Sequence, residues 1–447
     1  MKSFILKVFF LSFTAMAFSQ AGHIMQGVGA VNMSMGGAAT AQPLDISGAM
    51  QWNPATLSTF NDKILKLDVG LFFSSPELSA SLPAGMLGPG APGVSGSTKD
   101  DRGMSPMPAL AMVWGKEGSK HTFGFSVFGI SGFGVTFPEE ANNPFSATFN
   151  PMENSNPINY PQTAGGFGHI ESDYMLLQVG ATWAYELTDK FSIGIQPNIN
   201  YSSLELAPNP TASPTMAGYP TTNKASAIGF GAQFGLFYDS GFGLKLGASY
   251  KMPQTFFKFK FTNTYLDNTT SKNEFQMDYP GIFSIGLGYS EGDVDLALDF
   301  RRVDYENTAG FTNSGWTSTA SVAGFGWKDI SILSAGLQYK GINKLPLRIG
   351  YTYSSNPIPD ELTFFNIPAT AVIKNAYQFG FSYVMNDSWK LDAVYHYGDS
   401  NGSTVGNILS PQMVSPNNPL GAIPGSSVSY KMTTSMVQFG ISYTFNK

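Results

Sequence analysis

The lengths of the links between strand-like segments constrain this fold more than any other feature of the sequence. From Lys63 onward, the chain repeats a unit of about ten residues in which large apolar and small polar side chains alternate. A period of two is typical of a β-strand. Fourteen such segments are predicted, over residues 63–73, 107–114, 121–131, 173–186, 190–204, 224–238, 241–251, 278–289, 293–303, 330–339, 345–354, 375–385, 388–397 and 433–445.

These segments are joined alternately by short turns and long loops. The short turns are GKEGSK, LTDK, DSGF, SEGD, KGINK and MNDS. The long loops, rich in Pro, Gly and Asn, cover residues 74–106, 132–172, 205–223, 252–277, 304–329, 355–374 and 398–432. An even strand number with this alternation is typical of an outer-membrane barrel, whose short turns face the periplasm, and a soluble sandwich has no reason to show it. We therefore predict an all-β fold, a 14-stranded antiparallel transmembrane β-barrel over residues 63–447.

The side-chain pattern and the composition support a barrel that faces lipid. Charged residues make up only 13% of the chain and aromatic residues 14%. After the N-terminal segment, no apolar run approaches the roughly 18–20 residues that a spanning helix needs. Aromatic residues near strand ends fit the girdles at the membrane interfaces; they are Trp114, Tyr250, Tyr289, Tyr353, Trp389 and Tyr443.

Residues 1–19 have the pattern of a secretory signal peptide. Lys2 and Lys7 precede the apolar core VFFLSFTAMAF, and the small residues Ala17 and Ser19 follow it. Export to the outer membrane is therefore expected. The chain has no cysteine, which excludes disulfides and a lipid anchor on cysteine, and its formal net charge of −6 argues against a nucleic-acid partner.

Residues 20–62 form a segment of different character before the first strand. It is rich in Gly, Ala, Met, Ser and Asn. It is too apolar for a solvated linker, but its large apolar side chains are too few to form a core of its own. We expect it to be a hatch that sits in the barrel lumen. Its end is marked by a turn, the candidate gate, made of Trp52, Asn53, Pro54 and Ala55.

Alternation along the strands places several charged residues on the inner face. These are Asp293, Asp295, Asp299, Arg301, Arg348, Lys390, Asp392 and His396. Facing lipid would cost about 2–4 kcal/mol for a basic side chain at mid-membrane. Two interpretations are open: a salt-bridged interior that holds the hatch, or a site where Arg301 or Arg348 attracts the head group of an amphipathic ligand.

Two outer loops are rich in phenylalanine. Loops 132–172 and 252–277 are candidate surfaces for catching an apolar ligand. The alternation of Phe and Lys over residues 256–261 also predicts a strand that continues above the membrane.

The sequence offers little for catalysis or metal binding. No histidine lies in a HExxH motif, and no G-x-S-x-G nucleophile elbow is present. Asp392, His396 and Ser400 span more than about 20 Å along one strand and cannot form a local triad. Asp293, Asp295 and Asp299 project in parallel and do not converge on an ion. We expect no enzyme activity, no cofactor and no metal.

Four stretches of the chain resemble the FadL-type family of outer-membrane transporters for hydrophobic compounds. They are the N-terminal Ala21-Gly22 with Asn53-Pro54-Ala55, FGFSVFGISGFGVTF at 123–137, LDFRRVDYENT at 298–308 and LRIGYTYSSNPIPDE at 347–361. The resemblance implies a fourteen-stranded barrel plugged by an N-terminal hatch. It also implies a kinked third strand that opens a lateral gap, for which Gly129, Gly132 and Gly134 are the candidates, although close packing or a turn would also explain these glycines.

The expected function is passive outer-membrane transport of long-chain fatty acids or similar hydrophobic compounds, gated by the hatch and with a lateral exit. Uptake of aromatic hydrocarbons by the same fold is the alternative, followed by a polar-solute porin or a structural barrel; a barrel lipase is disfavoured. The expected partners are the hydrophobic ligand and outer-membrane lipid, and the barrel is expected to be a monomer.

Overall fold

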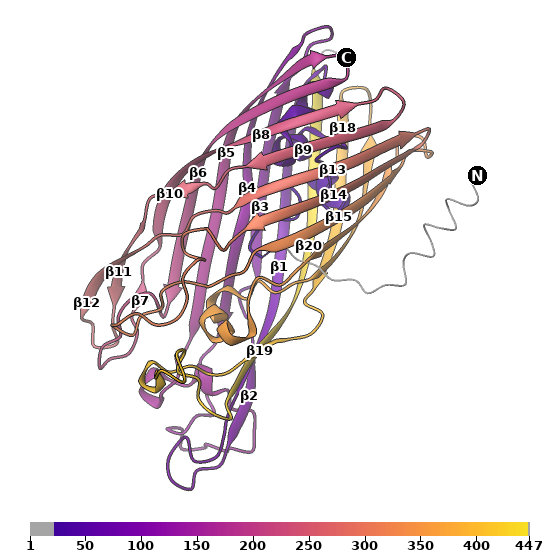
Figure 1. The fold of residues 1–447 in the computed structure, drawn as a ribbon. Helices are drawn as coiled ribbons and strands as arrows, with labels where there is room; N and C mark the ends of the chain where they lie inside the picture. The colour runs from indigo at the N-terminus through magenta and orange to yellow at the C-terminus, as the bar shows by residue number, and fades with distance from the viewer. Residues whose placement is uncertain (1–21, 446–447) are drawn as a thin grey trace.

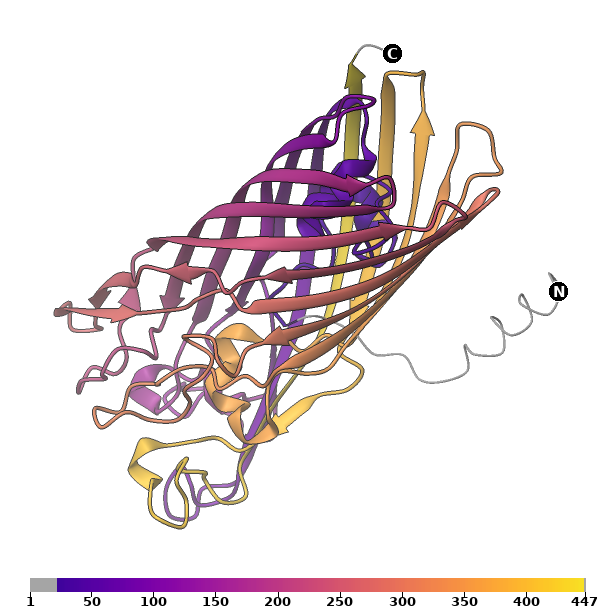
Figure 2. The same ribbon diagram turned by 45° about the horizontal axis from the view of Figure 1, so that its top comes forward.

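The computed structural model describes residues 22–445, and the predicted signal peptide lies outside the described residues. The described chain forms one antiparallel sheet of 17 strands. Three of them are short strands near the outer loops: β2 (Val94–Lys99), β10 (Thr255–Phe256) and β19 (Thr404–Gly406). The other fourteen make the wall of a barrel (Figures 1 and 2); they are β1 (Lys63–Leu82), β3 (Met104–Trp114), β4 (His121–Phe137), β5 (Ile170–Thr188), β6 (Phe191–Ala207), β8 (Ala225–Asp239), β9 (Leu244–Lys251), β13 (Gly281–Glu291), β14 (Val294–Asp304), β15 (Ile330–Tyr339), β16 (Leu347–Ser354), β17 (Asn375–Val384), β18 (Trp389–Asp399) and β20 (Ser427–Phe445).

The barrel closes because its first and last strands pair with each other. The ladder between β1 and β20 runs from Lys63↔Phe445 to Ser81↔Ser427. Closure leaves no sheet edge exposed to hydrocarbon, where unpaired backbone groups could not bind water. The fourteen predicted strands are thus confirmed, although β1, β4 and β20 are longer than predicted. No helix among residues 22–445 is long and apolar enough to cross a membrane.

Each wall strand alternates between a lipid-facing and a lumen-facing side chain. On β5, Met175 and Trp183 are 44% and 38% exposed, whereas Gln178 between them is fully buried. Of the charged residues predicted to face inward, Lys390 is half-buried and six others are buried: Asp295, Asp299, Arg301, Arg348, Asp392 and His396. The prediction is wrong for Asp293, which is exposed in the turn before β14, where strand alternation no longer applies.

The long loops gather at the end of the barrel opposite the C-terminus (Figure 1). There, β7 (Thr221–Thr222), β11 (Phe259–Thr264) and β12 (Thr270–Phe275) form a separate three-stranded sheet. Phe259 and Phe261 of β11 are buried and Lys260 is exposed, so a strand is present from Phe259 onward, but it belongs to this separate sheet and does not continue a strand of the wall as predicted. Five 3-10 helices complete the loops: η3 (Pro157–Asn159), η4 (Gln162–Ala164), η5 (Asp360–Leu362), η6 (Phe364–Ala369) and η7 (Pro411–Met413).

Residues 22–62, called the N-terminal segment below, lie inside the barrel (Figure 2). The segment contains α2 (Ala30–Ser34), α3 (Ile46–Trp52) and η2 (Pro54–Thr59), and every residue of α2 and α3 is buried. Asp45 caps α3 by accepting a hydrogen bond from the Gly48 amide at 3.0 Å. Helices this short gain their stability from packing against the wall rather than from intrinsic propensity.

Glycines on the inner face of the wall make room for this segment. A Cβ at Gly247 would coincide with the carbonyl oxygen of Thr40, and one at Gly350 with the backbone nitrogen of Gly36. The backbone of the segment therefore lies directly on the backbone of the strands. These glycines account for part of the small-residue pattern that the sequence shows on one face of each strand.

Candidate functional site

The hydrogen-bonded ladder between β3 and β4 stops partway along the two strands. It runs from Trp114↔Phe123 to Ala109↔Phe128 and ends there. Beyond that point β3 pairs with β1 as far as Met104, and β4 pairs with β5 as far as Phe137. The facing edges of residues 104–108 and 129–137 thus form no ladder with each other, which leaves a gap in the wall.

Local sequence explains why the ladder ends there. Pro106 and Pro108 on β3 have no N–H to donate. On β4, the pairing with β5 shifts register between Gly129 and Ser131, which marks a bulge at Ile130. Of the three glycines singled out from the sequence, Gly134 is required by close approach, because a Cβ there would overlap the Arg102 guanidinium.

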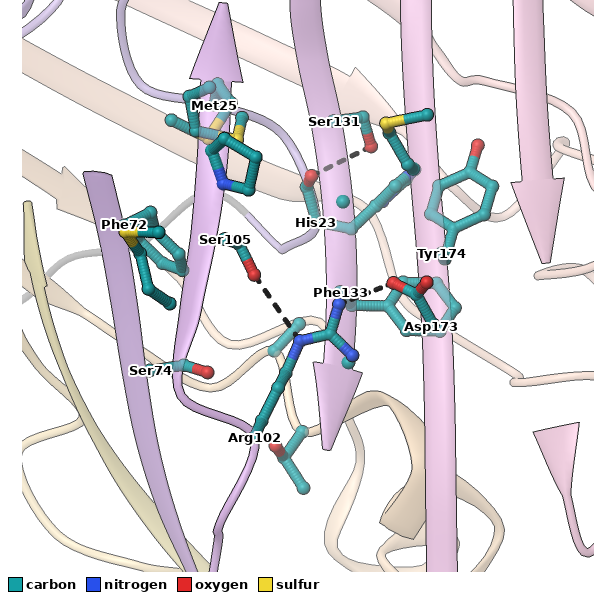
Figure 3. Close-up of a pocket in the computed structure, with 18 of the residues that line it drawn as sticks. His23, Met25, Phe72, Ser74, Arg102, Ser105, Ser131, Phe133, Asp173 and Tyr174 are labelled. Atoms are coloured by element: carbon teal, nitrogen blue, oxygen red, sulfur yellow. Dashed lines mark hydrogen bonds and ion pairs between the residues drawn. The ribbon is translucent and has the colours of Figure 1, made fainter. Parts of the chain in front are cut away.

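The start of the N-terminal segment takes the place of β3 beside this part of β4. Ile24 forms an isolated antiparallel bridge with Ser131. The Met25 amide donates to the Ile130 carbonyl at 3.0 Å, and the Gly132 amide donates to the His23 carbonyl at 3.2 Å. The Ser131 hydroxyl also donates to the His23 carbonyl, at 2.9 Å (Figure 3). The bulged edge of β4 is therefore satisfied from inside the barrel.

His23 is enclosed by aromatic rings. Six ring centroids lie 5.1–6.4 Å from the imidazole, those of Phe133, Tyr174, Tyr279, Tyr305, Phe311 and Trp327. Its Nδ1 lies 2.9 Å from the Tyr305 hydroxyl. Burial lowers the pKa of His23 to about 3, so the imidazole is neutral at ordinary pH.

A cavity of about 340 Å³ lies between the gap and His23 (Figure 3). Its lining is largely apolar and includes five flexible methionines, Met25, Met104, Met107, Met175 and Met432, together with Phe72 and Phe133. Methionine side chains adapt to ligands of varied shape. The volume lies within the range of about 300–1,000 Å³ that is usual for small-molecule sites.

Three charged residues form one rim of the cavity. Asp173 on β5 lies 2.5 Å from Nη2 of Arg102 and also pairs with Lys224. Arg102 is held further by the Ser172 carbonyl, which accepts from Nη1 at 2.8 Å. The Lys224 side chain is 50% exposed, and its hydrogen bond to Asp173 raises the pKa of Lys224. Among the charged residues that line the cavity, two cations share one carboxylate; Glu205 also acts electrostatically on Lys224, and Asp100 on Arg102.

The sequence analysis did not find this rim. Arg102 lies in a predicted long loop, and Lys224 is the first residue of the predicted segment 224–238 but precedes β8 in the structure, so neither was assigned to the inner face. Their common partner Asp173 is 71 and 51 residues away along the chain. One sequence signal could have indicated Arg102. It is the glycine at position 134 of β4, which makes room for the Arg102 side chain.

The predicted head-group residues lie elsewhere in the lumen. Arg301 donates from Nη2 to the Gly37 carbonyl at 2.7 Å and to Asp299 at 2.6 Å. Arg348 donates to Gln338 at 2.7 Å and to Ser382 at 2.6 Å. Neither lines the cavity of Figure 3. A role for either residue in binding a ligand head group stays a prediction.

Wall carboxylates tie the N-terminal segment to the barrel. Asp299 accepts hydrogen bonds from the amides of Ala39 and Thr40, both at 2.9 Å. Lys66 lies 2.7 Å from Asp45 of the segment and 3.1 Å from Asp392 of the wall. Buried charges of this kind are tolerated because each has partners of opposite sign.

The candidate gate residues pack against the wall away from the cavity. The Asn53 side chain donates to the carbonyl oxygens of Thr40 at 2.7 Å and Leu236 at 2.9 Å, and its Oδ1 accepts from the Ala55 amide at 3.1 Å. The Trp52 carbonyl accepts from the Ser249 hydroxyl. These contacts place residues 52–55 against β8 and β9.

A second, smaller apolar crevice lies among the outer loops. Its volume is about 40 Å³, and its walls include Phe167, Tyr219, Trp316, Phe364 and Phe365. Phe167 belongs to loop 132–172, whose role in catching a ligand stays a prediction. Loop 252–277 contributes none of the crevice residues, because Phe256, Phe259 and Phe261 are buried in its own packing.

Comparison with known proteins identifies the family of this chain and structures with a similar fold. A family model described as outer membrane protein transport protein (OMPP1/FadL/TodX) matches residues 11–446. No curated protein matches the chain. The structure is similar to a FadL homologue from Pseudomonas aeruginosa, with a TM-score of 0.70 and 14% identity over 95% of this chain and all of the other.

Two toluene transporters have the same fold. For TodX from P. putida the TM-score is 0.65 at 16% identity, over 94% of this chain and 99% of the other. For TbuX from Ralstonia pickettii the TM-score is 0.61 at 17% identity, with the same coverage. Because the family model spans nearly the whole chain, this protein belongs to the FadL/TodX family of outer-membrane transporters of hydrophobic compounds.

Proposed function

We propose that this protein carries long-chain fatty acids, or amphipathic molecules like them, passively across the outer membrane and releases them sideways into the membrane. The observation that carries the proposal is the end of the β3–β4 ladder at Ala109↔Phe128, directly beside an apolar cavity. A ligand in that cavity faces a part of the wall where β3 and β4 form no ladder with each other.

The apolar lining of the cavity supplies the affinity for the ligand. Passive transport of this kind requires no energy source. Each methylene group that leaves water contributes about 0.8 kcal/mol. The methionines and phenylalanines of the cavity offer this burial, and the outer crevice around Phe167 and Trp316 offers a first apolar contact. The N-terminal segment acts as the hatch in this proposal, because it fills the lumen below the cavity and would have to shift to open a path to the periplasm.

The charged rim favours a fatty acid over a hydrocarbon. Arg102, Asp173 and Lys224 carry one net positive charge, and Lys224 is exposed enough to turn toward a ligand carboxylate. Uptake of an aromatic hydrocarbon is the alternative, supported by the similarity of the fold to the two toluene transporters and by the aromatic surroundings of His23. A hydrocarbon would gain nothing from the rim.

Binding to the purified barrel distinguishes these ligands. The protein would be extracted in mild detergent as a monomer, its bound lipids identified by mass spectrometry, and the delipidated barrel titrated with dodecanoate, dodecanol and toluene. We expect dodecanoate to bind more tightly than dodecanol, and Lys224→Met to weaken dodecanoate by about two- to fivefold while leaving toluene binding unchanged. Equal binding of dodecanoate and dodecanol would contradict a carboxylate preference. Binding of none of the three, with ion conductance through an open pore, would refute the transport proposal.

A further inference from the structure

Lys251, the last residue of β9, is a buried cation without a carboxylate partner among the described residues. Its side chain is directed into the lumen, and the residue is 2% exposed. The ammonium group donates to the amide oxygens of Gln178 at 3.1 Å and Gln51 at 3.4 Å. Gln51 belongs to α3 of the N-terminal segment. Amide oxygens satisfy hydrogen bonds but do not balance a full charge.

The other buried cations of the lumen have carboxylates close to them. Lys66 lies between Asp45 and Asp392, and Arg301 is paired with Asp299 at 2.6 Å. Arg348 has Asp392, Asp45 and Asp295 close enough to act on it electrostatically. For Lys251, the charged neighbour is another cation, Arg301. An uncompensated buried charge costs several kcal/mol. A bound anion would therefore stabilise the charged form of Lys251.

Two neighbours of Lys251 each have an unused donor. Nε2 of Gln51 and Nε of Arg301 are buried, and within residues 22–445 neither has a hydrogen-bond partner. Arg301 also lies against Trp52, the neighbour of Gln51, with its guanidinium carbon 3.7 Å from the ring centroid. Gln233, the cross-strand partner of Lys251, contributes an unpartnered acceptor that a water molecule would fill. Asp299, the partner of Arg301, also has one unpartnered carboxylate oxygen, and the formal charges of Lys251, Arg301 and Asp299 sum to one positive charge.

This donor group lies one layer below the cavity. Tyr174, which lines the cavity, and Gln178, which accepts from Lys251, both face inward on β5. They are four residues apart, which corresponds to about 13 Å along a strand. The hydroxyl groups of Tyr174 and Tyr279 and Nε2 of His23 are buried and have no partner among the described residues, and Tyr174 and His23 also line the cavity. The cavity wall therefore carries unpartnered neutral polar groups at Tyr174, four residues from Gln178.

We propose that Lys251, Gln51 and Arg301 form a second binding site for the carboxylate of an amphipathic ligand, on the periplasmic side of the cavity. The carboxylate accepts from the ammonium group, from Nε2 of Gln51 and from Nε of Arg301, while Arg301 keeps its ion pair with Asp299. Entry requires α3 to move, because Gln51 occupies the lumen beside Lys251. The inference rests on the proposed transport of anionic amphiphiles. An inorganic anion has the same acceptor chemistry and is the other source to be tested.

The test is carbon-13 NMR of [1-¹³C]dodecanoate bound to the full-length protein in detergent, with Lys251→Gln as the variant. Lys245→Gln is the matched control, since it removes the same charge from the same strand at its other end. We expect two bound carboxyl signals in the wild type and in the control. In Lys251→Gln, the affinity for the second signal should fall by about tenfold or more, and Lys251→Arg should restore it.

Each outcome of this test has a defined meaning. A single carboxyl signal in the wild type, or a second signal unchanged in Lys251→Gln, refutes the inner site and leaves the proposed function standing. No bound dodecanoate at all refutes both. Chloride or phosphate that displaces the second signal at concentrations below that of dodecanoate would assign the site to inorganic anions and overturn the proposal. If Lys251→Gln fails to fold, Lys251→Met and Gln51→Leu apply the same criterion.

Discussion

The guanidinium carbon of Arg301 lies 3.7 Å above the ring of Trp52, so a strand of the wall and a helix of the N-terminal segment meet in a cation–π contact. The same guanidinium is paired with Asp299, whose carboxylate accepts from the backbone of residues 39 and 40. One ion pair of β14 thus holds two parts of the segment at once. Its loss should loosen the segment more than the loss of any single contact.

Asp299→Asn should release the N-terminal segment from the wall. The substitution removes the negative charge, leaves Arg301 buried without its partner and turns one acceptor into a donor. Breaking a buried ion pair in this way costs about 3–5 kcal/mol. We expect a lower thermal unfolding temperature and faster entry of small sugars into proteoliposomes. Asp267→Asn, at a fully exposed loop carboxylate, is the control, and equal permeability of the two variants would contradict a role for Asp299 in holding the segment.

Gly134→Ala should disturb the charged rim of the cavity without unfolding the barrel. The added methyl group would overlap the Arg102 guanidinium and lie 2.6 Å from the Ser172 carbonyl oxygen, so Arg102 would have to leave Asp173 and the backbone of β5 would have to shift locally. We expect weaker dodecanoate binding and a lower unfolding temperature, with the barrel still folded. Gly129→Ala is the matched control on the same strand, because its methyl group would meet Pro108 at an ordinary distance of 3.6 Å. If both variants bind dodecanoate like the wild type, the rim does not contribute to binding.

The strands of the barrel could be predicted because each is fixed by a local, repeated property. Lipid on one side and a packed lumen on the other impose alternation on every segment from Lys63 to Phe445. Beyond the membrane, the strands are no longer required to alternate between apolar and polar side chains. Strands β1 and β20 nevertheless continue to pair as far as Ser81↔Ser427, held by backbone hydrogen bonds that leave no trace in the pattern.

The site could be predicted only in part because its members meet through tertiary structure. The glycines of β4 pointed to the right strand, but the gap also depends on Pro106 and Pro108 of β3 and on the bridge between Ile24 and Ser131. Arg102 and Lys224 are ordinary loop residues until the fold brings both to Asp173. The same limit applies to Lys251, whose missing carboxylate partner is a property of its neighbours in space.

Deletion of Ile130 should impair lateral release. This residue is the one that the β4–β5 register skips, so its removal would let β4 continue straight and approach β3. Transfer of dodecanoate from the outer solution into the membrane of proteoliposomes should fall strongly, while dodecanoate binding in detergent should persist. Deletion of Asp189 in the β5–β6 turn, far from the gap, is the control. Undiminished transfer by the Ile130 deletion would contradict exit through this gap.

Acidification should loosen the start of the N-terminal segment through His23. Its pKa is lowered from 6.5 to about 3 by burial, so between these values the unfolded segment binds a proton that the folded segment does not. Stability is therefore fully present above pH 6.5 and is lost as the pH falls toward 3, at a rate approaching about 1.4 kcal/mol per pH unit. Hydrogen exchange of the Met25 and Gly132 amides, which bond across this contact, should quicken from pH 6.5 to pH 4 after correction for the intrinsic rate. His23→Phe keeps the aromatic packing but cannot bind a proton, so exchange at the same amides should lose this pH dependence; a dependence equal to that of the wild type would show that another group is responsible.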